Sequence, residues 1–146
     1  MKIYTIGFTR KSAKRFFELL KDNHIGRLID IRLKPGGQLA GFTKKDDLAY
    51  FLGELLGCEY HHFDFLAPSD DILKAYRKNK DWPGYEQKFE ALLDERDALS
   101  QLHPAFFAEK ACCLLCSEDR PDQCHRRLVA ERLARSWPGV EIVHLI

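Results

Sequence analysis

The sequence predicts an α/β domain of three layers, in which a mainly parallel central sheet of about five strands is flanked by helices. Three observations lead to this fold class. Short apolar and β-branched runs recur along the chain, as in strands that are covered on both faces. Longer segments with a helical hydrophobic period lie between them, an order typical of βαβ units. The 146 residues are 45% hydrophobic, so we expect one core and a single domain over residues 1–146.

Five strands are expected, at residues 2–6, 27–31, 59–63, 111–116 and 140–145. Each run is too short for a typical helix and is rich in β-branched, aromatic or other apolar residues. Their nearly continuous apolar character favours a parallel sheet over an antiparallel sheet with one wet face.

The first two helices are predicted from apolar residues that repeat at i, i+3, i+4 and i+7. In the first helix these are Ala13, Phe16, Phe17 and Leu20. In the second they are Leu48, Phe51, Leu52, Leu55 and Leu56. Residues 43–46 are close to a capping box, and Gly57 is placed to end the second helix.

Two more helices follow from start signals. One begins near residues 81–83 and buries Tyr85, Phe89, Leu92 and Leu93, while residues 64–81 before it are predicted as a loop with room for a short helix. The last has its start signal at Pro121 and Asp122, with Asp122 as its N-cap, and ends before residues 138–139. This start would put Cys124 and His125 in the first turn, where free N–H groups favour anions and lower a thiol's pKa.

Composition narrows the class of protein. A net charge of +1 gives no global field for nucleic acid, so only a local patch could bind a polyanion. No stretch approaches the roughly 20 apolar residues of a membrane span, and the N-terminal segment does not resemble a signal peptide, so we expect a cytoplasmic protein without a membrane partner. The five cysteines are an odd number outside any disulfide framework and are predicted to be reduced thiols.

The carboxyl ends of parallel strands meet at one edge of a sheet, where ligands bind in open α/β folds. Gly7 and Thr9 follow the first strand, where the glycine lets the backbone approach a ligand and the threonine can cap the first helix. Asp30 and Arg32 end the second strand on one face, before a glycine-rich loop over residues 34–41. These strand ends are expected to converge.

The stretch LLCSEDRPDQCHRR, residues 114–127, is the third such end. The strand should deliver Cys116 and Glu118 to the same edge, and the last helix should begin there with Cys124, His125 and Arg126. We expect an anion site in this strand-to-helix turn. A structural salt-bridge cluster around the arginines is the competing interpretation.

Several of these motifs together resemble a known family. Thr5-Ile6-Gly7, Asp30-Ile31-Arg32 with Pro35, and Cys116-x-Glu118 followed by Cys124-His125-Arg126 match in order the blocks of the small bacterial and archaeal domain of unknown function 488. Phe42, Tyr60 and His61 also fall at its usual aromatic and Tyr-x-His positions. The family often has His-Ser after Thr-Ile-Gly, where this chain has Phe8-Thr9. The resemblance covers nearly the whole chain and implies a fold more than a function, since no activity is established for the family.

The first hypothesis is an enzyme acting on an anionic ligand, such as a phosphate-bearing metabolite, a nucleotide or a nucleic acid. The expected catalytic residues are Asp30, Cys116, Glu118 and Cys124, as acids, bases or nucleophiles. The expected ligand-binding residues are Gly7, Thr9, Arg32, His61, His125 and Arg126. The sequence assigns no metal site and identifies no cofactor.

Other readings stay open. The chain could be a regulatory module that binds an anion or a metal without turnover, the metal ligands being Cys116, Glu118, Cys124 and His125. It could also be a redox-sensitive thiol protein. The spacing between Cys116 and Arg120 does not fit a tyrosine phosphatase or rhodanese loop. No Walker, GxGxxG or Gly-x-Ser-x-Gly motif is present.

One further segment has a pattern of its own. Residues 76–85, YRKNKDWPGY, combine aromatic and basic side chains that could stack on and pair with a nucleic-acid strand. Such a segment is more often a solvated loop that leads into a helix.

Overall fold

The computed structural model describes residues 1–146, except the side chains of residues 38–40. Its sheet has five strands, all parallel, in the order β3-β2-β4-β1-β5. The strands are β1 (Lys2–Gly7), β2 (Arg27–Asp30), β3 (Glu59–His62), β4 (Cys112–Cys116) and β5 (Glu141–Leu145). All five predicted strands are present, each within one residue of its expected ends.

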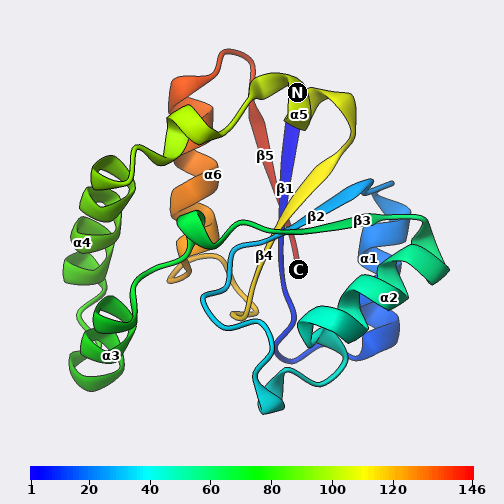
Figure 1. The fold of residues 1–146 in the computed structure, drawn as a ribbon, viewed down its shortest axis with the longest axis horizontal. Coiled ribbons are helices and arrows are strands. Elements are labelled where there is room, and N and C mark those ends of the chain that lie inside the picture. Colours follow the sequence, from blue (N-terminus) through cyan, green and yellow to red (C-terminus); the bar gives the residue numbers. More distant parts are fainter.

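Helices cover both faces of the sheet, which confirms the three-layer α/β fold (Figure 1). One face is covered by α1 (Ala13–Asp22) and α2 (Lys45–Leu56), whose Phe16 and Leu52 pack with Leu28 of β2. The other face carries α3 (Asp70–Asn79), α4 (Trp82–Glu95), α5 (Pro104–Glu109) and α6 (His125–Ser136). There Phe89 and Leu128 pack with side chains of the strands. Short 3₁₀ helices occupy Gln38–Thr43, Asp64–Leu66 and Ala98–Gln101.

The chain leaves β1 and β4 toward opposite faces of the sheet. From β1 it passes through α1 to β2, and from β4 it passes through α6 to β5. These neighbouring strands are in register, with Gly7 opposite Cys116 at their carboxyl ends. Such a switch in direction opens a crevice beyond the strand ends, the usual ligand site of open α/β sheets.

The helix ends agree with the sequence in part. Helix α4 begins at Trp82 and Gly57 ends α2 in the left-handed region with φ of 58°, both as expected. Asp81 caps α4 by accepting a bond from Gly84 N at 3.1 Å. Two caps differ. Ser12, not Thr9, accepts the bond that caps α1. No side chain caps α2, because Thr43 is buried and accepts a bond from Arg32 instead.

Three helices depart from prediction. Helix α5 (Pro104–Glu109) was not predicted at all. Residues 70–79 form the helix α3, capped by Ser69, where the sequence predicted mainly a loop. The last helix begins at His125, two residues later than predicted, with Cys124 as N-cap instead of Asp122. Before it, Cys124 N donates to Pro121 O at 3.2 Å, so Pro121 belongs to a turn and not to the helix.

None of the helices in the described structure is long and apolar enough to cross a membrane.

Candidate functional site

A cavity of about 510 Å³ lies at the carboxyl ends of the strands, between the switch point and α3 and α4. It brings together five of the predicted site residues: Arg32, Cys116, Glu118, Cys124 and His125. The expected convergence of the strand ends with the start of α6 is therefore confirmed. The rest of the wall is formed by Phe8, Leu33, Lys34, Gly37, Pro68, Asp70, Leu73, Tyr76, Arg77, Lys80, Trp82, Tyr85, Ser117 and Gln123.

Positive charge predominates in this cavity. Arg32, Lys34, Arg77 and Lys80 contribute four cations, against two carboxylates, Asp70 and Glu118.

The four cations differ in their partners. Lys34 Nζ lies 3.7 Å from Asp70 Oδ1, and Arg32 pairs with Asp30 behind the wall. Among the described side chains, no carboxylate pairs with Arg77 or Lys80, and both are exposed. These two cations are available to an anionic ligand.

Aromatic rings form another part of the wall. Trp82 stacks on Tyr85 with ring centroids 4.8 Å apart and an interplanar angle of 17°, and Tyr76 packs edge-on against both. Tyr76 Oη also donates to Gln123 Oε1 at 3.1 Å, which joins α3 to the turn before α6. Burial raises the pKa of Tyr85, so its hydroxyl stays protonated near neutral pH.

Asp30 is fully buried and does not line the cavity. Its carboxylate accepts from Arg32 Nε at 2.9 Å, from Arg32 Nη2 at 2.7 Å and from Tyr60 Oη at 2.6 Å. Burial, followed by this bond to Asp30, raises the pKa of Tyr60. With its oxygens occupied, Asp30 positions Arg32 and is not placed to act on a ligand as the catalytic group that we expected.

Arg32 links this network to the cavity. Its Nη2 also donates to Thr43 O at 2.6 Å, and its guanidinium lies over the Phe8 ring at 5.4 Å. The side chain is only 6% exposed, but it lines the cavity. A guanidinium fixed in this way can present its charge to an anion with little loss of side-chain freedom.

Arg126 was predicted to bind the ligand, and the structure places it elsewhere. The side chain is completely buried and is not part of the cavity wall. Its Nε donates to Thr5 Oγ1 at 3.2 Å, Nη2 to Asp119 O at 3.0 Å, and Nη1 to Glu118 O. Burial lowers its pKa to about 10. Arg126 therefore holds the turn before α6 through backbone carbonyls, a role closer to the structural cluster than to a direct anion ligand.

Gly7 and Thr9 hold the same turn from β1. A Cβ on Gly7 would lie 1.5 Å from Glu118 O, so the turn can pack here only against a glycine. Thr9 donates to Ser117 O through both its backbone N, at 3.0 Å, and its hydroxyl. The close approach predicted at Gly7 is confirmed, but the group that approaches it is the chain's own backbone at Glu118 and not a ligand. Neither Gly7 nor Thr9 lines the cavity.

Cys116 and Cys124 form a disulfide that closes the turn, so the expectation of reduced thiols is wrong for this pair. Their spacing of eight residues along the chain does not reveal that the turn folds back and brings the sulfurs together. Cys58, Cys112 and Cys113 are free and buried. Burial raises the pKa of Cys58 to about 11 and that of Cys112 to about 12, and the pKa of Cys113 lies well above its usual value.

His125 lies beside the disulfide and is buried. Its Nε2 is 2.7 Å from Ile31 O, and because a carbonyl only accepts, Nε2 carries the proton. Burial lowers the pKa of His125 to about 4, so the ring is neutral near pH 7.

Metal binding by this group fits the structure poorly. Cys116, Cys124 and His125 place one possible ligand atom each within 4.8 Å of the others. However, the two sulfurs are bonded to each other, and Arg126 Nη1 lies 3.6 Å and 3.7 Å from them. A fixed cation at this distance opposes a metal ion. Glu118 is not part of this group.

His61 does not line the cavity either. It lies in the edge strand β3, where Nε2 is 3.0 Å from Glu59 Oε1 and the ring packs against Phe63 and Phe106. The neighbouring His62 is the one that points to the site network, with Nε2 2.7 Å from Arg32 O.

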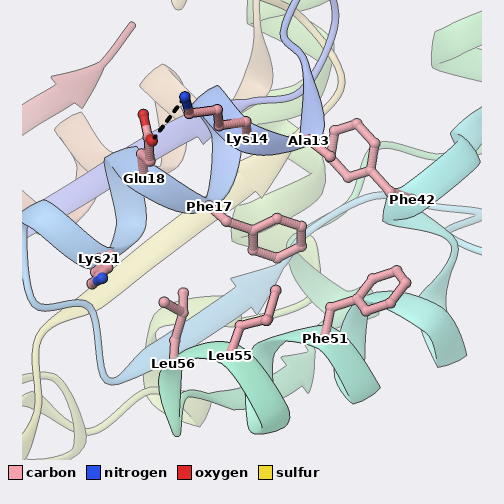
Figure 2. Close-up of a pocket in the computed structure, with 9 residues that line it drawn as sticks. All are labelled: Ala13, Lys14, Phe17, Glu18, Lys21, Phe42, Phe51, Leu55 and Leu56. Carbon is pink, nitrogen blue, oxygen red and sulfur yellow. Dashed lines mark ion pairs between the residues drawn. The ribbon is translucent and has the colours of Figure 1, made fainter.

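A second cavity, of about 480 Å³, lies on the other face of the sheet between α1 and α2. Figure 2 shows Phe17, Phe42, Phe51, Leu55 and Leu56 gathered around it, with Lys14, Glu18 and Lys21 at its rim. We call it the apolar groove. No predicted site residue lines it.

Comparison with known proteins gives a family. The model of the family described as "Domain of unknown function DUF488" matches residues 12–133. The chain belongs to this family. The match confirms the resemblance seen in the motifs, and the family's description assigns no activity. No curated protein and no solved structure matches the chain.

The sequence missed the α3 wall of the site. Asp70, Leu73, Arg77 and Lys80 reach the cavity because they lie three or four residues apart on one side of the helix and its C-cap. The signal that could have found them was the aromatic and basic run at residues 76–85, which contributes Tyr76, Arg77, Lys80, Trp82 and Tyr85 to the wall. That this run forms a wall of the cavity could be recognised only once residues 70–79 were known to form α3.

Proposed function

We propose that the cavity at the strand ends binds a phosphate-bearing ligand with a planar ring, of the nucleotide class. The observation that carries this proposal is the composition of one wall. Arg77 and Lys80, which have no described carboxylate partner, lie beside Tyr76 and Trp82. A nucleotide combines the two features that such a wall recognises, a phosphate and a flat aromatic ring.

Charge supports the phosphate half of the proposal. Arg32 is held rigidly by Asp30 and Thr43, while Arg77 and Lys80 extend from α3 on the other side of the cavity. Bonds from a charged donor to phosphate oxygens contribute roughly 1.5–3 kcal/mol each.

Ring packing and volume support the other half. Trp82 and Tyr85 already stack in parallel, and a base can extend such a stack for about 1–3 kcal/mol. The volume of about 510 Å³ falls within the range of small-molecule sites.

Glu118 is the residue best placed for chemistry on such a ligand. It is an exposed carboxylate in the wall, whereas Asp30 is enclosed and both thiols of the Cys116–Cys124 pair are bonded to each other. If the ligand is turned over, Glu118 serves as the general acid or base, and neither cysteine acts as a nucleophile in the oxidised form.

The test is thermal stabilisation of the purified chain by matched probes: nucleoside mono-, di- and triphosphates, the parent nucleosides, inorganic phosphate and a short single-stranded oligonucleotide. We expect a nucleotide to stabilise the chain more than its nucleoside or inorganic phosphate at the same concentration. Stabilisation by the oligonucleotide alone, falling steeply with salt, would instead indicate nucleic acid. No response to any nucleotide would refute the proposal.

A further inference from the structure

We propose that the Cys116–Cys124 disulfide is a reversible thiol–disulfide exchange site, which low-molecular-weight thiols reach through the cavity. The proposal concerns the cystine itself and does not require that a nucleotide binds.

The position of the disulfide supports exchange. It joins the last residue of β4 to the N-cap of α6 and closes the turn between them. Both cysteines line the cavity, although they are only 1% and 3% exposed. The cavity is thus the route by which a small thiol would reach the bond. The free thiols Cys58, Cys112 and Cys113 do not line it.

Arg126 provides the chemical reason why this disulfide should undergo exchange. Its Nη1 lies 3.6 Å from Cys116 Sγ and 3.7 Å from Cys124 Sγ. Bonds to Thr5 and to two backbone carbonyls fix the guanidinium in this place. In the described chain no carboxylate forms an ion pair with Arg126, so a thiolate formed at either sulfur would be the first anion against this buried cation.

A cation at this position favours the step that opens the disulfide. A thiolate RS⁻ attacks one sulfur, the S–S bond breaks, and its electron pair remains on the other sulfur, which leaves as a thiolate beside Arg126. A second RS⁻ then attacks the mixed disulfide at the small molecule's sulfur, which releases RSSR and the second protein thiolate. Two RSH are oxidised to RSSR, the cystine is reduced to two cysteines, and their two protons pass to the solvent or to the new thiolates. Stabilisation of the leaving thiolate accelerates the first step.

The primary experiment uses the unmodified oxidised chain in buffers of reduced and oxidised glutathione. Thiols are trapped with iodoacetamide under native conditions, and the labelled peptides are identified by mass. We expect only Cys116 and Cys124 to become labelled, and to be protected again when oxidised glutathione is added in excess. Their labelling rate should reach half its maximum below pH 8.5, the ordinary pKa of a free thiol.

Two variants test the role of the cation. Arg126→Gln should raise the pH midpoint of labelling by at least about one unit, whereas Arg126→Lys should shift it less, because it retains a positive charge. Cys112→Ala is the matched control and should leave both the redox equilibrium and the pH midpoint unchanged. If the Arg126 variants fail to fold, the pH profile of the unmodified chain still decides the matter.

Three results would overturn the proposal. Equal resistance of all five cysteines under reducing native conditions would show that the bond is inaccessible. A labelling midpoint at or above the ordinary thiol value would show that Arg126 does not stabilise a thiolate. A reduced chain that retains one zinc ion and thereby resists labelling would identify the pair as metal ligands.

Discussion

The structure contains two cavities of similar size and opposite chemistry. The apolar groove between α1 and α2 has about 480 Å³, and the cavity at the strand ends has about 510 Å³. The groove is lined by phenylalanine and leucine, with charges only at its rim, whereas the other cavity combines cations, carboxylates, aromatic rings and a disulfide.

The difference lies in what supports each wall. At the cavity at the strand ends are two buried arginines: Arg32, which lines the cavity, is held by a carboxylate, and Arg126, which does not line it, is held by backbone carbonyls. At the apolar groove, the lining rings of Phe17 and Phe42 pack against each other and against the buried ring of Phe16. Placing charges out of water is costly unless they are bonded. Volume therefore does not distinguish the two cavities, whereas fixed buried charge is found at the cavity at the strand ends.

The largest effect on stability is expected from Asp30→Asn. Asp30 is fully buried, and losing its charge leaves Arg32 without its anionic partner, which should lower the free energy of unfolding by about 3–5 kcal/mol. Asp70→Asn is the control, because Asp70 lines the same cavity but forms only solvent-accessible pairs, with Lys34 and Lys74, and its change should cost less than about 1 kcal/mol. Urea denaturation measures both. Equal losses would mean that the buried pair contributes no more than a surface pair.

Two glycine-to-alanine substitutions, one in each region, should change the stability of the fold in opposite directions. Gly7→Ala places a Cβ 1.5 Å from Glu118 O, so the turn must move, at a cost of about 3 kcal/mol. Gly53→Ala in α2, beside the apolar groove, meets nothing within 4 Å and should stabilise by about 0.5–1 kcal/mol. Melting temperatures report both changes. A harmless Gly7→Ala would contradict the tight packing of the turn.

The next effect depends on pH. The pKa of His125 is lowered from 6.5 to about 4 because the ring is buried. The unfolded chain binds the proton first, so this contribution to stability is complete above pH 6.5 and is lost as pH falls toward 4, by roughly 3 kcal/mol. His125→Gln should remove that part of the pH dependence. Denaturant titrations at several pH values test this, and parallel curves for the two chains would show that His125 titrates normally in the fold.

Much of the fold could be predicted because its elements carry local signals. The strands β2 and β4 are buried at every residue, so their apolar runs stand out. Helix α3 could not be predicted in the same way, since Ile72 is its only residue that is buried among those described. Most of its surface is polar, which hides the helical period.

The site was predicted in its location but not in all its roles. Arg32 and Glu118 line the cavity, because strand ends of a parallel sheet share an edge. Arg126 binds the carbonyls of Glu118 and Asp119, and backbone partners leave no trace in residue identity. The pairing of Cys116 with Cys124 likewise depends on the path of the turn, which is set by Gly7 and Thr9 at another strand end.

The central claim is that fixed and unpaired cations make the cavity at the strand ends a nucleotide-class site. The most direct test is the affinity of the double variant Arg77→Glu/Lys80→Glu for the most stabilising nucleotide, with Lys14→Glu/Lys21→Glu at the apolar groove as control for the same change in net charge. Calorimetry should show affinity weakened by about 100-fold or more in the first variant and within about threefold of the unmodified chain in the second. Equal affinity of the two variants would contradict the account.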